Sequence, residues 1–161
     1  SCHEEGSPEE EVITVSVKYQ DREISFDDNY QEVKSAYIYE QQMEDHLKKA
    51  GVKDVIVIAE INEIKDGYTD DSVFNDAASL TRVFLSSDSC TKEQAENITE
   101  EFCSWMKSDN PQGYGEFRFY ILSAEAFASL NRYNYEDVLE DAGFEGRIIC
   151  SIGKNGEVTI R

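Results

Sequence analysis

The chain has no long apolar run and comparatively few cationic side chains. No stretch approaches the roughly 18 consecutive apolar residues that a membrane-spanning helix needs. Lysine and arginine number 15 against 34 aspartates and glutamates, so the formal net charge is −19. A field of that sign repels phosphate backbones and anionic lipid headgroups, which argues against direct binding to nucleic acid or to a membrane surface.

The sequence also lacks the short motifs that mark common catalytic and cofactor sites. It contains no C-x-x-C, H-E-x-x-H, P-loop or G-x-G-x-x-G pattern, so zinc and nucleotide sites have no positive support. The two histidines, His3 and His46, lie in no recognisable nucleophile motif. We therefore expect no cofactor, and we favour a non-enzymatic function.

The remaining composition is that of a folded chain. Hydrophobic residues make up 40% of the 161 residues, with nine tyrosines and eight phenylalanines. A chain of this length can bury a core without disulfides or metals. We expect residues 1–11 to form a flexible acidic tether and residues 12–161 to form a single domain.

Periodicity predicts the elements of the first half of the domain. Residues 12–19 alternate between apolar and polar, which is typical of a half-buried strand, and residues 23–26 are its expected hairpin partner. Apolar residues at helical spacing predict a helix over 30–50, ended by Gly51. Residues 52–64 include a run that is apolar on both faces, so we expect a central strand covered on both sides.

The second half continues with helices and strands. Residues 73–85 carry apolar side chains at helical spacing, and Thr91 with Gln94 forms a capping box that opens a further helix. A strand is expected over 117–122 and an interrupted helical stretch over 123–142. The sequence therefore predicts an α+β fold, with a single mixed or mainly antiparallel sheet and about four helices packed on it.

Asn155-Gly156 is the strongest hairpin signal in the chain. A two-residue turn there would place Lys154 opposite Glu157. In that register Val158 shares a face with Ile149, and the last strand is an edge.

A cysteine near the start of the sequence stands before a polar, acidic stretch. Ser1-Cys2 followed by residues 3–11 resembles the processing site and tether of bacterial lipoproteins. The resemblance covers this segment alone and implies a diacylated Cys2, export, and a lipid anchor in the cell envelope as the sole link to a membrane. The alternative is a cytoplasmic protein.

The four cysteines allow few pairings. A straight helix that begins at Thr91 and reaches Cys103 holds Cys90 and Cys103 about 18–20 Å apart, which is too far for a disulfide. Cys103–Cys150 and Cys90–Cys150 pairs stay open. We expect Cys103 and Cys150 to be reduced and buried.

Cys90 is a candidate reactive thiol. It stands at a predicted helix N-terminus, where the pKa of a thiol should fall. A catalytic thiol would need a histidine, and His46 is the candidate within the domain. We favour a packing role for Cys90.

Two further sets of residues are candidate binding sites. Asp66, Asp70 and Asp71 surround a glycine-containing loop and could gather oxygen ligands for calcium, although the loop departs from the EF-hand pattern and turn formation also explains it. Tyr39 and Tyr135 belong to closely spaced tyrosine pairs, in each of which one ring should be core and the other rim. We take both as candidate surface contacts for a protein or glycan.

Three functions remain. The first is a membrane-anchored, exported interaction or accessory domain without enzymatic activity. The second is a cytoplasmic, acidic, immunity-type protein that neutralises a basic partner, as the net charge of −19 suggests. The third is a thiol-dependent enzyme that uses Cys90.

Overall fold

The computed structural model of the chain describes residues 14–20, 23–28 and 30–161. The expected tether and the expected lipid-attachment site, Cys2, lie outside the described residues. The helices and strands are β1 (Val15–Gln20), β2 (Glu23–Asp28), α1 (Tyr30–Lys49), β3 (Val55–Ile64), a 3-10 turn (Asp70–Ser72), α2 (Val73–Asp76), β4 (Ala77–Ser86), α3 (Lys92–Asp109), β5 (Tyr114–Leu122), α4 (Ala124–Ser129), α5 (Tyr135–Ala142), β6 (Gly146–Ile152) and β7 (Val158–Ile160).

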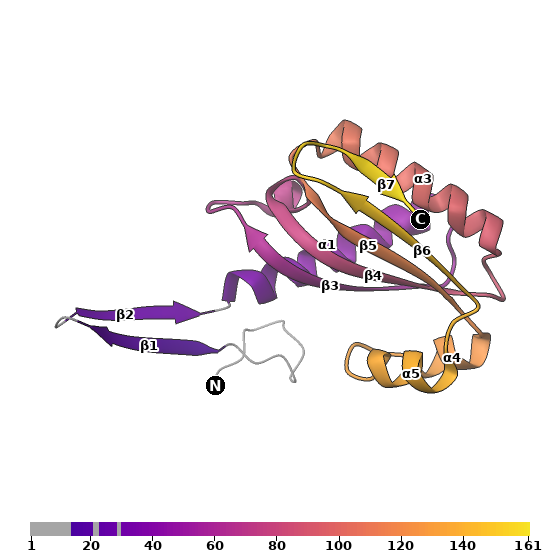
Figure 1. The fold of residues 1–161 in the computed structure, drawn as a ribbon, viewed down its shortest axis with the longest axis horizontal. Coiled ribbons are helices and arrows are strands. Elements are labelled where there is room, and N and C mark those ends of the chain that lie inside the picture. Colours follow the sequence, from indigo (N-terminus) through magenta and orange to yellow (C-terminus); the bar gives the residue numbers. More distant parts are fainter. Residues whose placement is uncertain (1–13, 21–22, 29) are drawn as a thin grey trace.

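A five-stranded mixed sheet organises the domain, in the order β3-β4-β5-β6-β7 (Figure 1). The pair β4–β5 is parallel, and the other neighbouring pairs are antiparallel. With helices packed on this sheet, the predicted α+β fold is confirmed. No helix in the described ranges is long and apolar enough to cross a membrane.

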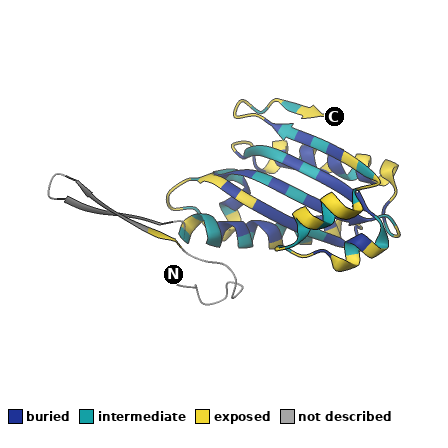
Figure 2. Cartoon of the chain, turned by 60° about the horizontal axis from the view of Figure 1, so that its bottom comes forward, coloured by how far each residue is buried: buried dark blue, intermediate teal, exposed yellow. Residues whose placement is uncertain are grey.

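Helices cover the two faces of the sheet unequally. The long helices α1 and α3 bury one face, where Met43, Phe102, Phe117 and Phe119 belong to the main core. On the other face α4 and α5 enclose a smaller cluster that includes Phe84. These short helices lie over one end of that face (Figure 2).

The predicted central strand over 52–64 is an edge strand. β3 is buried on both faces, because Val57 belongs to the main core and Ile58 to the smaller cluster, but it stands first in the sheet order. Helix α1 protects its outer edge. Glu44 accepts a hydrogen bond from the Val57 N–H at 3.3 Å, and Glu40 accepts one from the Ala59 N–H at 2.7 Å. These two N–H groups in the middle of β3 are therefore not available for pairing with another strand.

The predicted helix over 73–85 is wrong for most of its length. Only Val73–Asp76 is helical, and Ala77–Ser86 forms β4. This strand lies inside the sheet, so Val83 faces the main core and Phe84 the smaller cluster. A strand that is apolar on both faces gives no alternation, and its apolar residues then match helical spacing as well.

The capping box at the start of α3 is confirmed. The Gln94 N–H donates to Thr91 Oγ1 at 3.3 Å, and the Thr91 N–H donates to Gln94 Oε1 at 2.8 Å. Two N–H groups that a helix start leaves without a helical partner are thereby satisfied.

The C-terminal hairpin forms with a longer loop than predicted. Ile152 lies opposite Val158, and the Gly153 N–H donates to the Glu157 carbonyl at 2.9 Å. Val158 and Ile160 therefore share a face with Ile152 and Cys150 rather than with Ile149, because a shift of one residue reverses the face of every side chain. Lys154 pairs with Glu63 at 3.5 Å instead of with Glu157. The prediction that β7 is an edge strand is confirmed.

The N-terminal hairpin is confirmed as an element but stands apart from the main sheet. β1 and β2 pair antiparallel, with Val17 opposite Phe26 and Tyr19 opposite Ile24, and form a two-stranded sheet of their own. The expectation of one sheet is thus corrected for this hairpin.

Candidate functional site

A groove runs between helices α1 and α3 on the outer side of the domain. Three adjoining cavities of about 240, 410 and 270 Å³ lie along it. Ala50 and Glu101 line the first and second cavities, and His46, Lys49 and Trp105 line the second and third. We call this continuous depression the helix groove.

Aromatic rings form the middle of the helix groove. The Trp105 indole stacks on the His46 imidazole, with 4.0 Å between ring centroids and 22° between ring planes. Phe74 lies edge-on to Trp105 at 5.0 Å, and Phe102 lies beneath it at 5.7 Å. Trp105 and His46 are half-buried. Because these three rings hold the half-buried indole in place, it forms a fixed apolar contact surface.

The walls of the helix groove are mainly acidic. Asp45 on α1, Glu101 on α3 and Asp71 beside α2 line it, against one lysine, Lys49. Carboxylates around a recessed apolar floor raise the local concentration of cationic ligands.

The imidazole of His46 adds no compensating charge at neutral pH. Burial is the main cause that lowers its pKa below the usual value of 6.5, and Lys49 lowers it further. The carboxylates of Glu101 and Asp109 raise the pKa of His46, but the pKa stays below its usual value. A neutral imidazole leaves the carboxylates of the helix groove dominant.

Cys90 lies at the end of the helix groove, but it is not an activated thiol. Its side chain lines the first cavity, while the residue is only 3% exposed. Burial raises the pKa of the thiol above its ordinary value, and the Sγ atom donates to the Thr91 carbonyl at 3.6 Å. The expected lowering of this pKa is wrong, because desolvation outweighs the influence of the helix N-terminus.

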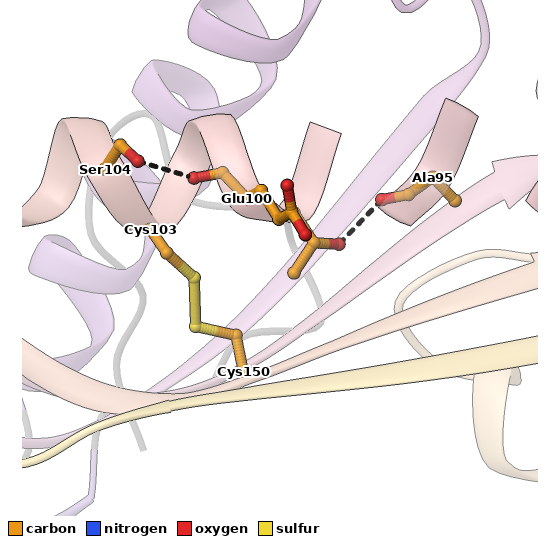
Figure 3. The surroundings of a disulfide bond; sticks show 6 residues. Ala95, Glu100, Cys103, Ser104 and Cys150 are labelled. Atoms are coloured by element: carbon orange, nitrogen blue, oxygen red, sulfur yellow. Dashed lines mark hydrogen bonds between the residues drawn. A yellow bond between two sulfur atoms is a disulfide. The ribbon is translucent and has the colours of Figure 1, made fainter. Parts of the chain in front are cut away.

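A disulfide joins the wall of the groove to the sheet. Cys103 on α3 is bonded to Cys150 on β6 (Figure 3). The expectation that both cysteines are reduced is wrong, and one of the two pairings that the sequence left open is formed. Cys103 follows Phe102 on the buried side of α3, so the bond fixes this helix over the sheet.

The two candidate tyrosines have different environments. Tyr39 is 1% exposed and accepts a hydrogen bond from Ser79 at 3.2 Å, and burial raises the pKa of its hydroxyl. Its assignment as a surface contact is therefore wrong. Tyr135 is half-buried on α5 and lies 5.0 Å from the Arg82 guanidinium. Burial is the largest cause that raises its pKa to about 12.

The candidate calcium ligands do not converge. Asp66, Asp70 and Asp71 are exposed, and the part of the chain described here holds no group of three or more histidine, cysteine, aspartate or glutamate side chains arranged to bind a metal ion. The Asp70 carbonyl instead accepts a hydrogen bond from Gln42 at 2.6 Å. Asp71 lines the helix groove.

The residues of the groove floor carry little signal in the sequence. Ile98, Phe102 and Trp105 stand at helical spacing, a pattern typical of core residues. Ile98 and Trp105 are half-buried while Phe102 is buried. A tryptophan at the margin of an apolar stripe is the one signal that could have indicated the groove.

Comparison with known proteins identifies no relative: no family model, no curated protein and no solved structure matches the chain.

Proposed function

We propose that this protein is a non-enzymatic interaction domain that binds a basic segment of a partner protein in the helix groove. The observation that carries the proposal is the aromatic floor of Trp105 and His46 between acidic walls. Tryptophan is among the residues that contribute most to binding energy at protein interfaces.

The charge of the whole chain supports a cationic partner. A net charge of −19 accelerates the approach of a basic protein and repels acidic ones. Within the groove, Asp45 and Glu101 stand on opposite helices, so a lysine or arginine lying over the indole could pair with either wall. The apolar floor would hold the stem of such a side chain.

We further propose that the domain is exported and anchored to the cell envelope through a lipid on Cys2. The disulfide between Cys103 and Cys150 supports export, since such bonds persist in oxidising compartments. Labelling cells with a palmitate analogue tests the anchor. Label should enter the full-length protein and be absent from the Cys2→Ser variant, and equal labelling of the two would contradict the anchor.

The groove is tested with the chain's single tryptophan as the reporter. A short peptide rich in lysine and arginine is titrated into the protein while Trp105 emission is recorded. The variant Glu101→Lys reverses a charge that lines the groove. Glu100→Lys is the matched control, because Glu100 is the exposed neighbour on the same helix and lines none of the three cavities.

We expect saturable changes in emission that weaken with salt, as screening predicts. Glu101→Lys should lose affinity by about tenfold, in keeping with about 1.4 kcal/mol for a lost pairing and a new repulsion. Glu100→Lys should lose much less. Equal losses of affinity in the two variants would mean that binding depends on the net charge of the chain and not on the helix groove.

The net charge also favours the second candidate, an immunity-type protein in the cytoplasm that neutralises a basic toxin or nuclease. Such a protein would use the same groove, so the two candidates differ in compartment. A cytoplasmic protein should carry reduced Cys103 and Cys150 when isolated under thiol-trapping conditions, and it should take up no lipid label.

A further inference from the structure

The second surface of interest is the side of the sheet that faces away from the helix groove. Helices α4 and α5 pack against Ile56 and Phe84 at one end of this side. The rest of it lies beyond these short helices (Figure 2). We call this remainder the open face.

Charged residues of the open face form two neighbouring rows that run across the strands. The cation row consists of Arg82, Arg118 and Arg161: Arg82 lies opposite Arg118, and the backbone of Arg161 pairs with that of Ile149, which lies opposite Arg118. Glu60 and Glu116 form the acid row, because both lie opposite Leu80, two residues along β4 from Arg82.

The two rows pair with each other within the chain. Arg82 contacts Glu60 at 2.7 Å, and Arg118 contacts Glu116 at 2.6 Å. Arg161 lies 3.7 Å from Glu116. Arg161 is 67% exposed, Glu60 51% and Arg118 34%, whereas Arg82 is only 11% exposed and lies against the Tyr135 ring of α5. The accessible part of the cation row is therefore Arg118 and Arg161. Each guanidinium has five N–H donors, so one carboxylate does not use its full capacity.

This concentration of arginine is out of proportion to the rest of the chain. The chain has six arginines, and the cation row contains three of them. Arg82 and Arg118 are neighbours on the parallel strands β4 and β5, and the carboxylates of Glu60 and Glu116 offset their like charges. Arginine is enriched at protein–protein interfaces, so its concentration on this face makes the face a candidate contact surface.

We propose that the open face binds the open face of a second copy of this chain. A two-fold axis parallel to the rows sets the cation row of one protomer against the acid row of its partner, and by symmetry the reverse. Such a surface is self-complementary, as an isologous dimer requires. Salt at physiological concentration screens the long-range repulsion between two chains of net charge −19, so the short-range pairing of the rows decides whether the protomers associate. Arg118 and Glu116 of the two protomers would then alternate in charge around the axis.

Two arguments favour a second copy over a foreign acidic protein. A uniformly acidic partner would meet the acid row as well as the cation row, and Glu60 and Glu116 would oppose it. The face also carries half-buried Leu80 and Ile149, which supply apolar contacts between paired sheets. The dimer leaves both helix grooves exposed on its outer sides, so it does not depend on the proposed function.

Sedimentation of the full chain over a micromolar concentration series tests the dimer. The first variant, Arg118→Glu with Arg161→Glu, replaces two arginines of the cation row by glutamates. The second variant, Glu60→Arg with Glu116→Arg, replaces both glutamates of the acid row by arginines. Lys92→Glu with Lys107→Glu on α3 is the control that matches the charge of the first variant, since both lysines are exposed away from the open face. Circular dichroism melting verifies that every variant folds.

The wild-type protein and the α3 control should sediment as dimers at the upper concentrations. Each row variant alone should lose the dimer, because like charges then meet. An equimolar mixture of the two row variants should regain it, since the reversed rows are complementary to each other. A wild-type protein that stays monomeric throughout the series, a row variant that still dimerises, or a mixture that stays monomeric would each overturn the proposal.

Discussion

At the scale of single residues, the stacked pair of His46 and Trp105 provides a fluorescence signal from within the helix groove. Burial lowers the pKa of His46, and its ring lies 4.0 Å from the indole. A change of charge on this imidazole should therefore alter the emission of the chain's single tryptophan.

We predict a step in Trp105 emission with a midpoint below the ordinary histidine pKa of 6.5. The folded protein accepts this proton at a lower pH than the unfolded chain does. Between the two pKa values the unfolded chain binds more protons, so stability rises with pH across that window. His46→Gln should abolish the step. A midpoint at or above 6.5, or a step that survives in His46→Gln, would contradict the environment described for this residue.

Cys90 gives a second residue-scale prediction. Burial raises the pKa of its thiol, and the residue is 3% exposed. In a Cys2→Ser background, Cys90 should react with iodoacetamide at neutral pH at least about tenfold more slowly than in the denatured chain. Mass spectrometry of the alkylated protein measures the rate. Reaction faster than that of free cysteine would restore Cys90 as a candidate nucleophile.

The role of a residue can be predicted from the sequence where interactions with its near neighbours along the chain determine it. The Thr91–Gln94 capping box formed as expected. The expected pKa of Cys90 was wrong because position at a helix N-terminus is visible in a sequence, whereas the burial that outweighs it is not. Tyr39 was misplaced for the same reason, since its partner Ser79 lies forty residues away along the chain.

At the scale of elements, the disulfide should hold α3 in place. Replacing both Cys103 and Cys150 by serine should lower the free energy of unfolding by about 2–4 kcal/mol, as expected for a closed loop of this length. Urea denaturation monitored by circular dichroism measures the loss. Protein prepared without reductant should show two fewer titratable thiols when denatured than after reduction. Two additional free thiols before reduction would show that the bond is absent.

The outer edge of β3 should depend on Glu40 of α1. This buried carboxylate accepts the Ala59 N–H and also pairs with Arg132. Glu40→Ala leaves the guanidinium and the N–H without this partner, so unfolding free energy should fall by about 3–5 kcal/mol. Glu40→Gln keeps an acceptor and should lose less. Equal stability of Glu40→Ala and wild type in urea denaturation would contradict this role.

Helices and strands were predictable where the spacing of their apolar residues was distinct. The two main errors, a helix expected over 73–85 and a central position expected for the strand in 52–64, concern strands without such a distinct pattern. Helix α1 and the β1–β2 hairpin have one apolar face each in the sequence. β4 is apolar on both faces because helices cover both sides of the sheet there, so its pattern resembles that of a helix. β3 is likewise buried on both faces, and a strand buried in this way does not reveal whether it is central or an edge.

At the scale of the whole molecule, the five-stranded sheet separates two surfaces of different chemistry. The helix groove on the α1–α3 side is acidic with an aromatic floor, and the open face on the other side carries the paired rows of charge. Neither surface could be predicted from the sequence, because each draws residues from elements that are distant along the chain. Trp105 and His46, for example, meet only once α1 and α3 lie on the same face.

Nuclear magnetic resonance can locate the binding site for a basic peptide residue by residue. A peptide rich in lysine and arginine is added to isotope-labelled protein, and shifts of the amide signals and of the single indole N–H are mapped. If the helix groove is the binding site, the largest shifts should occur at Trp105, His46 and Glu101. Shifts spread evenly over the acidic surface, with the indole signal unmoved, would contradict it.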